Sequence, residues 1–532
     1  MKKKYIYKYI KIFFVSISAL FWGSCEDFLE TYPKDFLSPE TFYETEDQLD
    51  AALRSVYQIL ASYSLYGDRM QSELALQADE GFNYNASPMG NVRHYNVSAS
   101  DKDIYNFWQT LYKGIDMANV LLENIHRPKD MDEKRRNEIK GETLFLRGYF
   151  YFLLVQHFGE IPLKLESSKT ADDGYELQSP IADVYAQIRE DLINAEALVS
   201  PIDEVGYGGR VSKSAVQGIL ARVSLFMAGH PLQDQSKWKE AKLWAQKVID
   251  SHLHELNPDY EQVFRNYAQD KYDYKESIFE VEFYGNNEPP YTSGGKVGLN
   301  VGGPLYHKDQ SATYGVSYGW VYGVAWLHNS YTEGDVRRDR NIANYAFNTK
   351  TGELIDRSNI TPYGRAARKW DRRDESATSR VRVFSPQNFP ILRYSDVLLM
   401  FAEANNEIGG NEDSTLMCLN MVRRRGMGIP VDQDDAFVDI PKGKSQDELR
   451  QEIRDERPRE LCYEALRKGD IVRWGIFTER MAFTAEEMSR APGWGTNARR
   501  AYFTNASARD TLWPIPEKER GFNKNLKQNN GW

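Results

Sequence analysis

Residues 144–162 have the sequence Leu-Phe-Leu-Arg-Gly-Tyr-Phe-Tyr-Phe-Leu-Leu-Val-Gln-His-Phe-Gly-Glu-Ile-Pro, which governs how the rest of the chain must pack. A helix over 142–158 would be apolar on almost every side, and such a helix is stable only when other elements cover it. Gly148 allows a neighbouring helix to approach closely, and Gly159 with Pro162 ends the helix. We therefore predict a central buried helix that other helices surround.

Helical patterns continue from this segment in both directions along the chain. Thr45 and Gln48 form a capping box, which predicts the N-terminus of a helix with an apolar face. Further helices are predicted over 103–126, 134–158, 180–198, 211–229, 236–252, 395–408 and 445–470. Helix pairs joined by short loops are typical of tetratricopeptide-like hairpins, although a regular repeat of about 34 residues is absent. The sequence thus predicts a mostly α fold with a tetratricopeptide-like helical hairpin scaffold.

The helical pattern is interrupted over 256–390. Within this segment, residues 284–331 are rich in glycine and hold nine aromatic residues, namely Tyr284, Tyr291, Tyr306, Tyr314, Tyr318, Trp320, Tyr322, Trp326 and Tyr331. Neither a helical nor a strand period is visible there, so we predict a long loop-rich insertion. Long loops in compact proteins are usually functional. The aromatic residues either form a binding surface on these loops or pack the loops onto the helices.

The first 24 residues are predicted to be a signal peptide. Five lysines lie within residues 2–11, an apolar stretch over 12–22 follows, and Gly23-Ser24-Cys25 comes next. The apolar stretch is too short to cross a membrane, which takes roughly 20 residues. A buried N-terminal helix is the alternative, but it leaves the lysine cluster unexplained. Two small residues before a cysteine also match the site at which bacterial lipoproteins are cleaved and lipidated, so we expect a lipid anchor on Cys25.

We divide the chain into the signal peptide at 1–24, an N-terminal helical region at 25–230 and a C-terminal region at 231–532. The C-terminal region contains the loop-rich insertion, and we expect both regions to pack as one globular unit. The chain has 25 Phe, 33 Tyr and 11 Trp, enough apolar surface for a large core. Its net charge of -10 disfavours nucleic-acid binding, and its three cysteines exclude a disulfide scaffold and a four-cysteine zinc site.

Motifs of known catalytic chemistry are missing from the sequence. It contains no G-x-S-x-G elbow, H-E-x-x-H motif or P-loop, and its histidines lack the spacing of metal ligands. Cys418 and Cys462 are expected to be buried thiols. The aspartates within 432–439 could gather oxygen ligands around Ca²⁺, but the glycine of an EF-hand loop is absent. We predict a protein that is not an enzyme and has no cofactor, with Ca²⁺ at this cluster as the alternative.

Residues 456–473 contain opposite charges at helical spacing, for example Glu464 with Lys468 and Arg467 with Asp470. A catalytic cluster of carboxylates and arginines is one interpretation of this run. A helix with salt bridges along its own surface is the interpretation that we favour, because the spacing matches pairs three and four residues apart.

Several blocks, taken together and in order, resemble the SusD/RagB family of surface lipoproteins that partner TonB-dependent transporters in Bacteroidota. Residues 144–162 are similar to the family's R-A-x-x-Y-F-x-L-V-x-x-F-G-D-V-P segment, and residues 389–404 contain Arg-Tyr-Ser-Asp-Val-Leu-Leu-Met-Phe-Ala-Glu-Ala, close to its R-Y-A-D-V-L-L-M-Y-A-E-A signature. The other blocks that resemble the family are 211–222, 420–425, 456–475 and 512–516 with 525–531.

The resemblance implies binding of a glycan at the outer face of the outer membrane and its delivery to a SusC-like barrel. Peptide capture by a RagB-like protein, a surface glycoside hydrolase and a purely structural scaffold are the alternatives. Sugar rings stack on aromatic side chains, and the sugar hydroxyls need polar partners. From this chemistry we predict that the ligand contacts Trp320, Tyr322, Tyr318 and Trp326, with a second wall formed by Asn83, Tyr84 and Tyr95.

Overall fold

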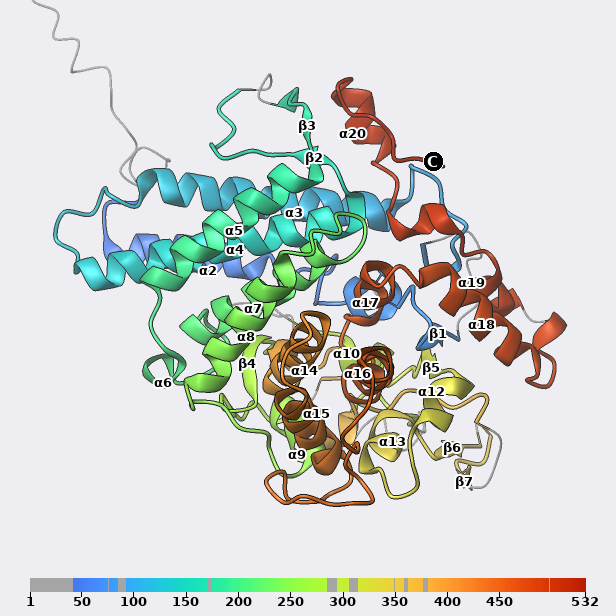
Figure 1. The fold of residues 1–532 in the computed structure, drawn as a ribbon. Coiled ribbons are helices and arrows are strands. Elements are labelled where there is room, and N and C mark those ends of the chain that lie inside the picture. Colours follow the sequence, from blue (N-terminus) through green and yellow to red (C-terminus); the bar gives the residue numbers. More distant parts are fainter. Residues whose placement is uncertain are drawn as a thin grey trace, which may run out of the picture.

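The computed structural model describes residues 42–74, 76–84, 92–170, 174–284, 294–305, 314–348, 350–357, 362–376, 381–496 and 498–532. The predicted signal peptide, Cys25, Tyr291 and Tyr306 lie outside these residues. Helices dominate the described part of the chain, and the strands are short and occur in pairs (Figure 1). The prediction of a mostly α fold is thus confirmed.

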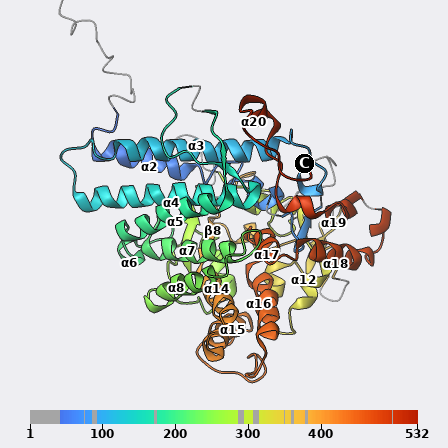
Figure 2. The same cartoon turned by 45° about the horizontal axis from the view of Figure 1, so that its top comes forward.

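The scaffold consists of antiparallel helix pairs that stack in chain order, as Figure 2 shows from α2 and α3 down to α15. Its helices are α2 (Glu46–Gln58), α3 (Lys102–Asn124), α4 (Glu133–Phe158), α5 (Ile181–Leu198), α6 (Ile202–Val205), α7 (Lys213–Ala228), α8 (Lys237–Asp250), α14 (Tyr394–Glu407), α15 (Glu412–Gly426) and α16 (Gln446–Leu461). Each helix of this part that was predicted before residue 445 lies within a few residues of its observed position. The capping box of Thr45 and Gln48 is also present.

Helix α4 is the buried centre of the scaffold, as its sequence predicts. It packs against α3 on one side and α5 on the other, and every residue from Gly141 to Val155 is buried. At Gly148 a Cβ atom would lie 3.3 Å from the Cβ of Asp191 on α5, so the glycine does permit a close approach. Beside it, Arg147 donates from Nε and Nη2 to the carboxylate of Asp191 at 2.8 and 2.6 Å, which fixes α4 against α5.

The insertion has more regular structure than the sequence indicates. It contains the helices α9 (Tyr260–Ala268), α10 (Val297–Asn300), α12 (Ala325–Ser330) and α13 (Val336–Asn341), and the strands β4 (Ser277–Val281), β5 (Val321–Gly323), β6 (Tyr345–Phe347), β7 (Leu354–Asp356) and β8 (Phe389–Arg393). The strands within it are too short to show a period in sequence. Strand β4 pairs antiparallel with β8, so the two ends of the insertion meet at one ladder.

The predicted helix over 445–470 is in fact two helices. α16 ends at Leu461, and α17 (Arg467–Arg473) begins after a turn in which Tyr463 and Ala465 have positive φ angles of 63° and 62°. α18 (Phe477–Ser489), α19 (Ala501–Thr504) and α20 (Glu517–Phe522) complete the C-terminal part. Within the described residues, no helix combines the length and the apolar character needed to cross a membrane.

Most charged residues of the run at 456–473 are buried. Pairs along its own helices exist, such as Arg459 with Glu456, but most of its ion pairs reach other elements, which corrects part of the salt-bridged-helix interpretation. Glu460 accepts hydrogen bonds from Arg425 at 2.6 Å, Arg393 at 2.9 Å and Arg337 at 3.3 Å. Glu464 pairs with Arg393 and with Lys369 rather than with its neighbour in sequence. Arg337 and Lys369 come from the insertion, so this buried ion network joins the insertion to the scaffold.

Candidate functional site

A two-stranded ribbon carries most of the predicted ligand contacts. Strand β1 (Gly81–Asn83) pairs antiparallel with β5, with Phe82 opposite Tyr322 and Asn83 opposite Val321. The next residue, Tyr84, donates its backbone N–H to the carbonyl oxygen of Trp320. Because side chains alternate between the two faces of a strand, the aromatic residues of both strands share one face. Asn83 and Val321, on the opposite face, are fully buried.

Four side chains on this face form two stacked pairs, which we call the aromatic platform. The rings of Tyr318 and Trp320 lie 4.9 Å apart with an angle of 12° between their planes. The rings of Tyr84 and Tyr322 lie 4.5 Å apart at 23°. Tyr84 and Tyr318 remain 44% and 45% exposed, so both pairs reach the surface. The platform thus offers flat aromatic faces of the kind on which sugars stack.

The backbone and the core hold the platform in place. The N–H groups of Tyr318 and Trp320 donate to the carbonyl oxygens of Leu299 and Asn300, 2.8 and 2.9 Å away, at the end of α10. Phe82 lies beside Tyr322, with ring centroids 6.0 Å apart, and is almost completely buried. Its ring contacts the rings of Trp494, Tyr502 and Phe503, which belong to the segment that follows α18. A rigid support of this kind lowers the entropy lost on binding.

Arg499 contacts the platform, and Arg357 acts on it electrostatically. The guanidinium group of Arg499 lies 3.5 Å from the ring centroid of Tyr84, and its Nε donates to the carbonyl oxygen of the same residue. Burial raises the pKa of the Tyr322 hydroxyl, while the positive charges of Arg357 and Arg499 act in the opposite direction. The hydroxyl is therefore neutral at physiological pH and can both donate and accept hydrogen bonds.

Three of the predicted site residues lie elsewhere. Trp326 is part of α12, where its Nε1 donates to the carbonyl oxygen of Asp79 at 2.6 Å and Arg480 lies over its ring. Asn83 is buried and donates to the carbonyl oxygen of Ser72. Tyr95 is only 2% exposed. The structure therefore brings Trp320, Tyr322, Tyr318 and Tyr84 together, but it does not add these three to the platform.

Sequence reasoning missed Phe82 and Arg499. The alternation Phe82-Asn83-Tyr84, which matches that of Trp320-Val321-Tyr322, was a signal for two short strands with one aromatic face. For Arg499 the sequence has no comparable signal, because its contact with Tyr84 depends on how the C-terminal segment folds back over the ribbon.

The other sites considered from the sequence have structural roles. Cys418 and Cys462 are buried free thiols, and burial raises the pKa of each to about 12, so neither is a ready nucleophile. Arg424 forms ion pairs with both Asp434 and Asp439, two carboxylates of the cluster considered for Ca²⁺. Across the ranges that the structure describes, no group of three or more His, Cys, Asp or Glu residues could hold a metal ion.

Two family models match the chain and together cover most of it. The model described as "SusD family" matches residues 261–532, and the model described as "Starch-binding associating with outer membrane" matches residues 27–225. Among curated proteins, SusD-like protein P2 of Formosa agariphila is 27% identical over 541 residues, which cover 98% of this chain and 99% of the relative.

Solved structures share the fold. A SusD homolog from Bacteroides thetaiotaomicron has a TM-score of 0.83 and 26% identity, over 93% of this chain and 98% of the other. A structure named "Laminarin binding SusD-like protein" has a TM-score of 0.71 and 23% identity, over 92% of this chain and 100% of the other. Surface glycan-binding protein A from Bacteroides fluxus has a TM-score of 0.68 and 22% identity, over the same shares of the two chains.

Proposed function

The chain belongs to the SusD family, and we propose that it binds a glycan through the aromatic platform at the cell surface and delivers it to a partner TonB-dependent outer-membrane transporter. The observation that carries this proposal is the platform itself, with two stacked aromatic pairs on one face of the β1–β5 ribbon. Relatives whose names include laminarin binding and surface glycan binding support the class of ligand.

The chemistry of the platform suits an oligosaccharide. The apolar C–H faces of a sugar ring stack on Trp320, Tyr318 and Tyr84, and stacking of this kind contributes through both buried area and ring electrostatics. The hydroxyl of Tyr322 and the guanidinium groups of Arg357 and Arg499 supply polar partners for sugar hydroxyls.

We further propose that the protein binds the glycan without cleaving it. Hydrolysis of a glycosidic bond uses two carboxyl groups at a fixed separation. The charged group in direct contact with Tyr84 of the platform is Arg499, and an arginine can serve neither as the acid nor as the nucleophile of such a reaction.

Replacing Trp320 and Tyr322 together by Ala is expected to weaken glycan binding at least about tenfold, or roughly 1.4 kcal/mol, because both stacked pairs lose a ring. Affinity gels with laminarin and a panel of neutral and acidic polysaccharides identify a ligand, and isothermal titration then measures the affinity. The melting temperature of the variant shows whether the fold is intact.

Tyr175→Ala is the matched control, because Tyr175 is also exposed and also stacks on another ring, that of Phe522, 5.1 Å away. We expect this variant to bind like the original protein. Unchanged affinity in the Trp320 and Tyr322 variant would remove the platform from the ligand site. Binding of peptides and of no polysaccharide would favour the RagB-like alternative.

We propose that Cys25 carries the lipid anchor, as its position after Gly23 and Ser24 suggests. Cys25→Ala is expected to move the protein from the outer-membrane fraction to soluble fractions, as measured by immunoblotting. Affinity purification of the anchored protein should recover a TonB-dependent barrel. Recovery of the protein alone under mild detergent would contradict the transporter partnership.

A further inference from the structure

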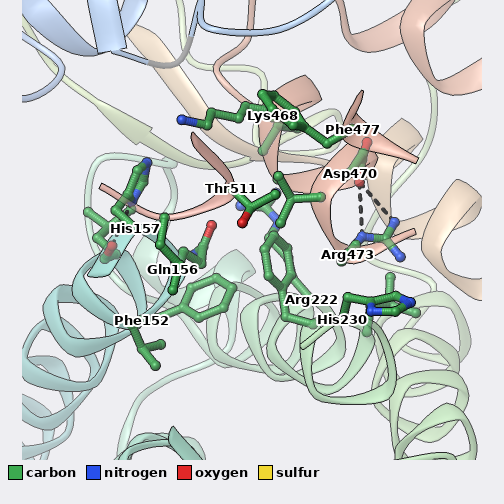
Figure 3. Close-up of a pocket in the computed structure, with 18 of the residues that line it drawn as sticks. Phe152, Gln156, His157, Arg222, His230, Lys468, Asp470, Arg473, Phe477 and Thr511 are labelled. Carbon is green, nitrogen blue, oxygen red and sulfur yellow. Dashed lines mark hydrogen bonds and ion pairs between the residues drawn. The ribbon is translucent and has the colours of Figure 1, made fainter. Parts of the chain in front are cut away.

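A cavity of about 380 Å³ lies inside the protein, between the C-terminal halves of α4 and α7 on one side and α17 with residues 508–512 on the other (Figure 3). Among its lining residues, His230 and Thr478 are exposed, so the cavity opens to solvent beside them. Its volume lies within the range of pockets that bind small molecules, roughly 300–1,000 Å³. The four residues of the aromatic platform do not line it, so the cavity is a separate feature.

Most of the wall is apolar. Phe152, Leu153, Leu225, Phe226 and Phe477 are among its lining residues. Figure 3 shows the side chains of Phe152, Gln156 and Thr511 around the centre of the cavity, with Lys468 at the top and Arg222 below. A ligand would therefore need a body that is largely aromatic or aliphatic, with few polar groups.

The arginines of the wall are already neutralised by carboxylates. Arg222 and Arg457 both bind Asp396, Arg457 and Arg473 both bind Asp470, and Arg473 also binds Glu403. This chain of contacts alternates in sign and holds three positive and three negative groups. Asp470, the carboxylate among the lining residues, is thus fully occupied by two guanidinium groups.

Lys468 lies outside this neutral chain. Its Nζ donates to the amide oxygen Oε1 of Gln77 at 2.8 Å, and the same oxygen accepts from Nε1 of Trp513 at 2.7 Å. The ammonium group lies 5.2 Å from the ring of Trp513 and 5.8 Å from that of Tyr95. Within the described residues no carboxylate lies within 4.0 Å of it. Lys468 is only 6% exposed. Burying an ammonium group that has no carboxylate in contact with it costs free energy of folding.

Two other polar groups line the cavity, a donor on Arg222 and an acceptor on His157. Nε of Arg222 is buried and has no hydrogen-bond partner, although its Nη2 binds Asp396 and the carbonyl oxygen of Ile391. His157 lies on the side of the cavity toward which the Lys468 side chain extends. Nδ1 of His157 must donate to the carbonyl oxygen of Leu153, 2.7 Å away, since that oxygen can only accept. Burial lowers the pKa of His157 to about 3, so Nε2 is left as an uncharged acceptor.

We propose that this cavity binds a small amphiphilic carboxylate, whose apolar body lies against the phenylalanines and whose carboxylate forms an ion pair with Lys468. The anion supplies a counter-charge in direct contact with Lys468, whereas the acidic group of the described residues that acts on it, Asp510, lies more than 4.0 Å away, and the apolar walls exclude strongly hydrated anions such as free phosphate. A ligand of this class is chemically distinct from a glycan, so the site is independent of the proposed function.

Isothermal titration of the purified protein with decanoate and with 4-phenylbutyrate tests the proposal. Each acid is compared with its neutral primary amide. We expect at least one acid to bind, and its amide to bind at least tenfold more weakly. Burial lowers the pKa of Lys468 to about 7, with Asp510 acting in the opposite direction. Binding of the anion at pH 8 should therefore be accompanied by uptake of about one proton, measured in buffers of different ionisation enthalpy.

Two variants locate the site. Lys468→Met is expected to lower the affinity for the acid at least tenfold, to abolish the proton uptake and to leave the amide affinity unchanged. Thr478→Trp, at the exposed mouth, should block both ligands, whereas Thr504→Trp, an equally exposed threonine on α19 outside the cavity, should block neither. Failure of both acids to bind, or binding that Lys468→Met and Thr478→Trp leave unchanged, would overturn the proposal. Glycan binding is measured in parallel, so failure of one proposal is distinguishable from failure of the other.

Discussion

Glu460→Gln is expected to lower the free energy of unfolding by about 3–5 kcal/mol, because it removes a single carboxylate that three buried guanidinium groups share. Glu460 is completely buried and accepts from Arg337, Arg393 and Arg425. Although burial alone would raise the pKa of this carboxyl group, these guanidinium groups hold it well below its usual range. Urea titration followed by circular dichroism measures the loss.

Glu452→Gln is the matched control for this variant, because Glu452 lies on the same helix, is partly exposed and pairs with Lys444 at 3.0 Å. Glu452→Gln should lower the free energy of unfolding by less than about 1 kcal/mol. A carboxylate with a lowered pKa stabilises the fold above its unfolded pKa, near 4.5, and the stabilisation disappears as the pH falls below that value. The difference in free energy of unfolding between the original protein and Glu460→Gln should therefore become smaller at acidic pH. Equal effects of the two variants would contradict the role assigned to the buried ion network.

Lys468→Met is expected to have the opposite effect and to stabilise the protein without ligand by about 3 kcal/mol at pH 6. The folded protein binds this proton less tightly than the unfolded chain, because burial lowers the pKa of Lys468 from 10.5 to about 7. The resulting loss of folding stability is complete below pH 7, and it disappears as the pH rises toward 10.5. The gain in melting temperature should thus be largest at pH 6 and nearly vanish by pH 10.

Lys369→Met provides the contrast, since Lys369 is equally buried but well paired. Its Nζ donates to Glu464 at 2.6 Å and to the carbonyl oxygens of Glu460 and Cys462 at 2.9 Å. These partners raise its pKa, although burial acts in the other direction. Lys369→Met should therefore destabilise the protein. Destabilisation by both lysine variants would show that Lys468 has a counter-charge in the folded protein.

The helices of the scaffold were predictable because the interactions that determine them are local in sequence. The apolar sequence of α4, the capping box at Thr45 and the short loops between helices all act within a few residues, so they fixed helix positions closely. The ion network was not predictable in the same way. Glu460 and Glu464 are spaced for contacts within one helix, yet their partners come from the insertion, from Arg393 and from α15.

The ligand site was predicted in part. Composition was enough to single out Tyr318, Trp320 and Tyr322, and the loop before α3 supplied Tyr84. Their arrangement depends on the pairing of β1 with β5, which are far apart in sequence, and a three-residue strand carries almost no periodic signal. Composition could not separate Trp326, an aromatic residue of the same segment that hydrogen-bonds to the core, from those on the exposed face.

The β4–β8 ladder gives the insertion the character of an exchangeable module. Since the chain leaves the scaffold at Val281 and returns at Phe389, which are paired in the ladder, the intervening loops can change in length at little entropic cost to the helices. Relatives could thus acquire new ligand preferences by recombination within this segment. Arg337 and Lys369 set a condition on such exchange, because a transplanted insertion must bring its own cations for Glu456, Glu460 and Glu464.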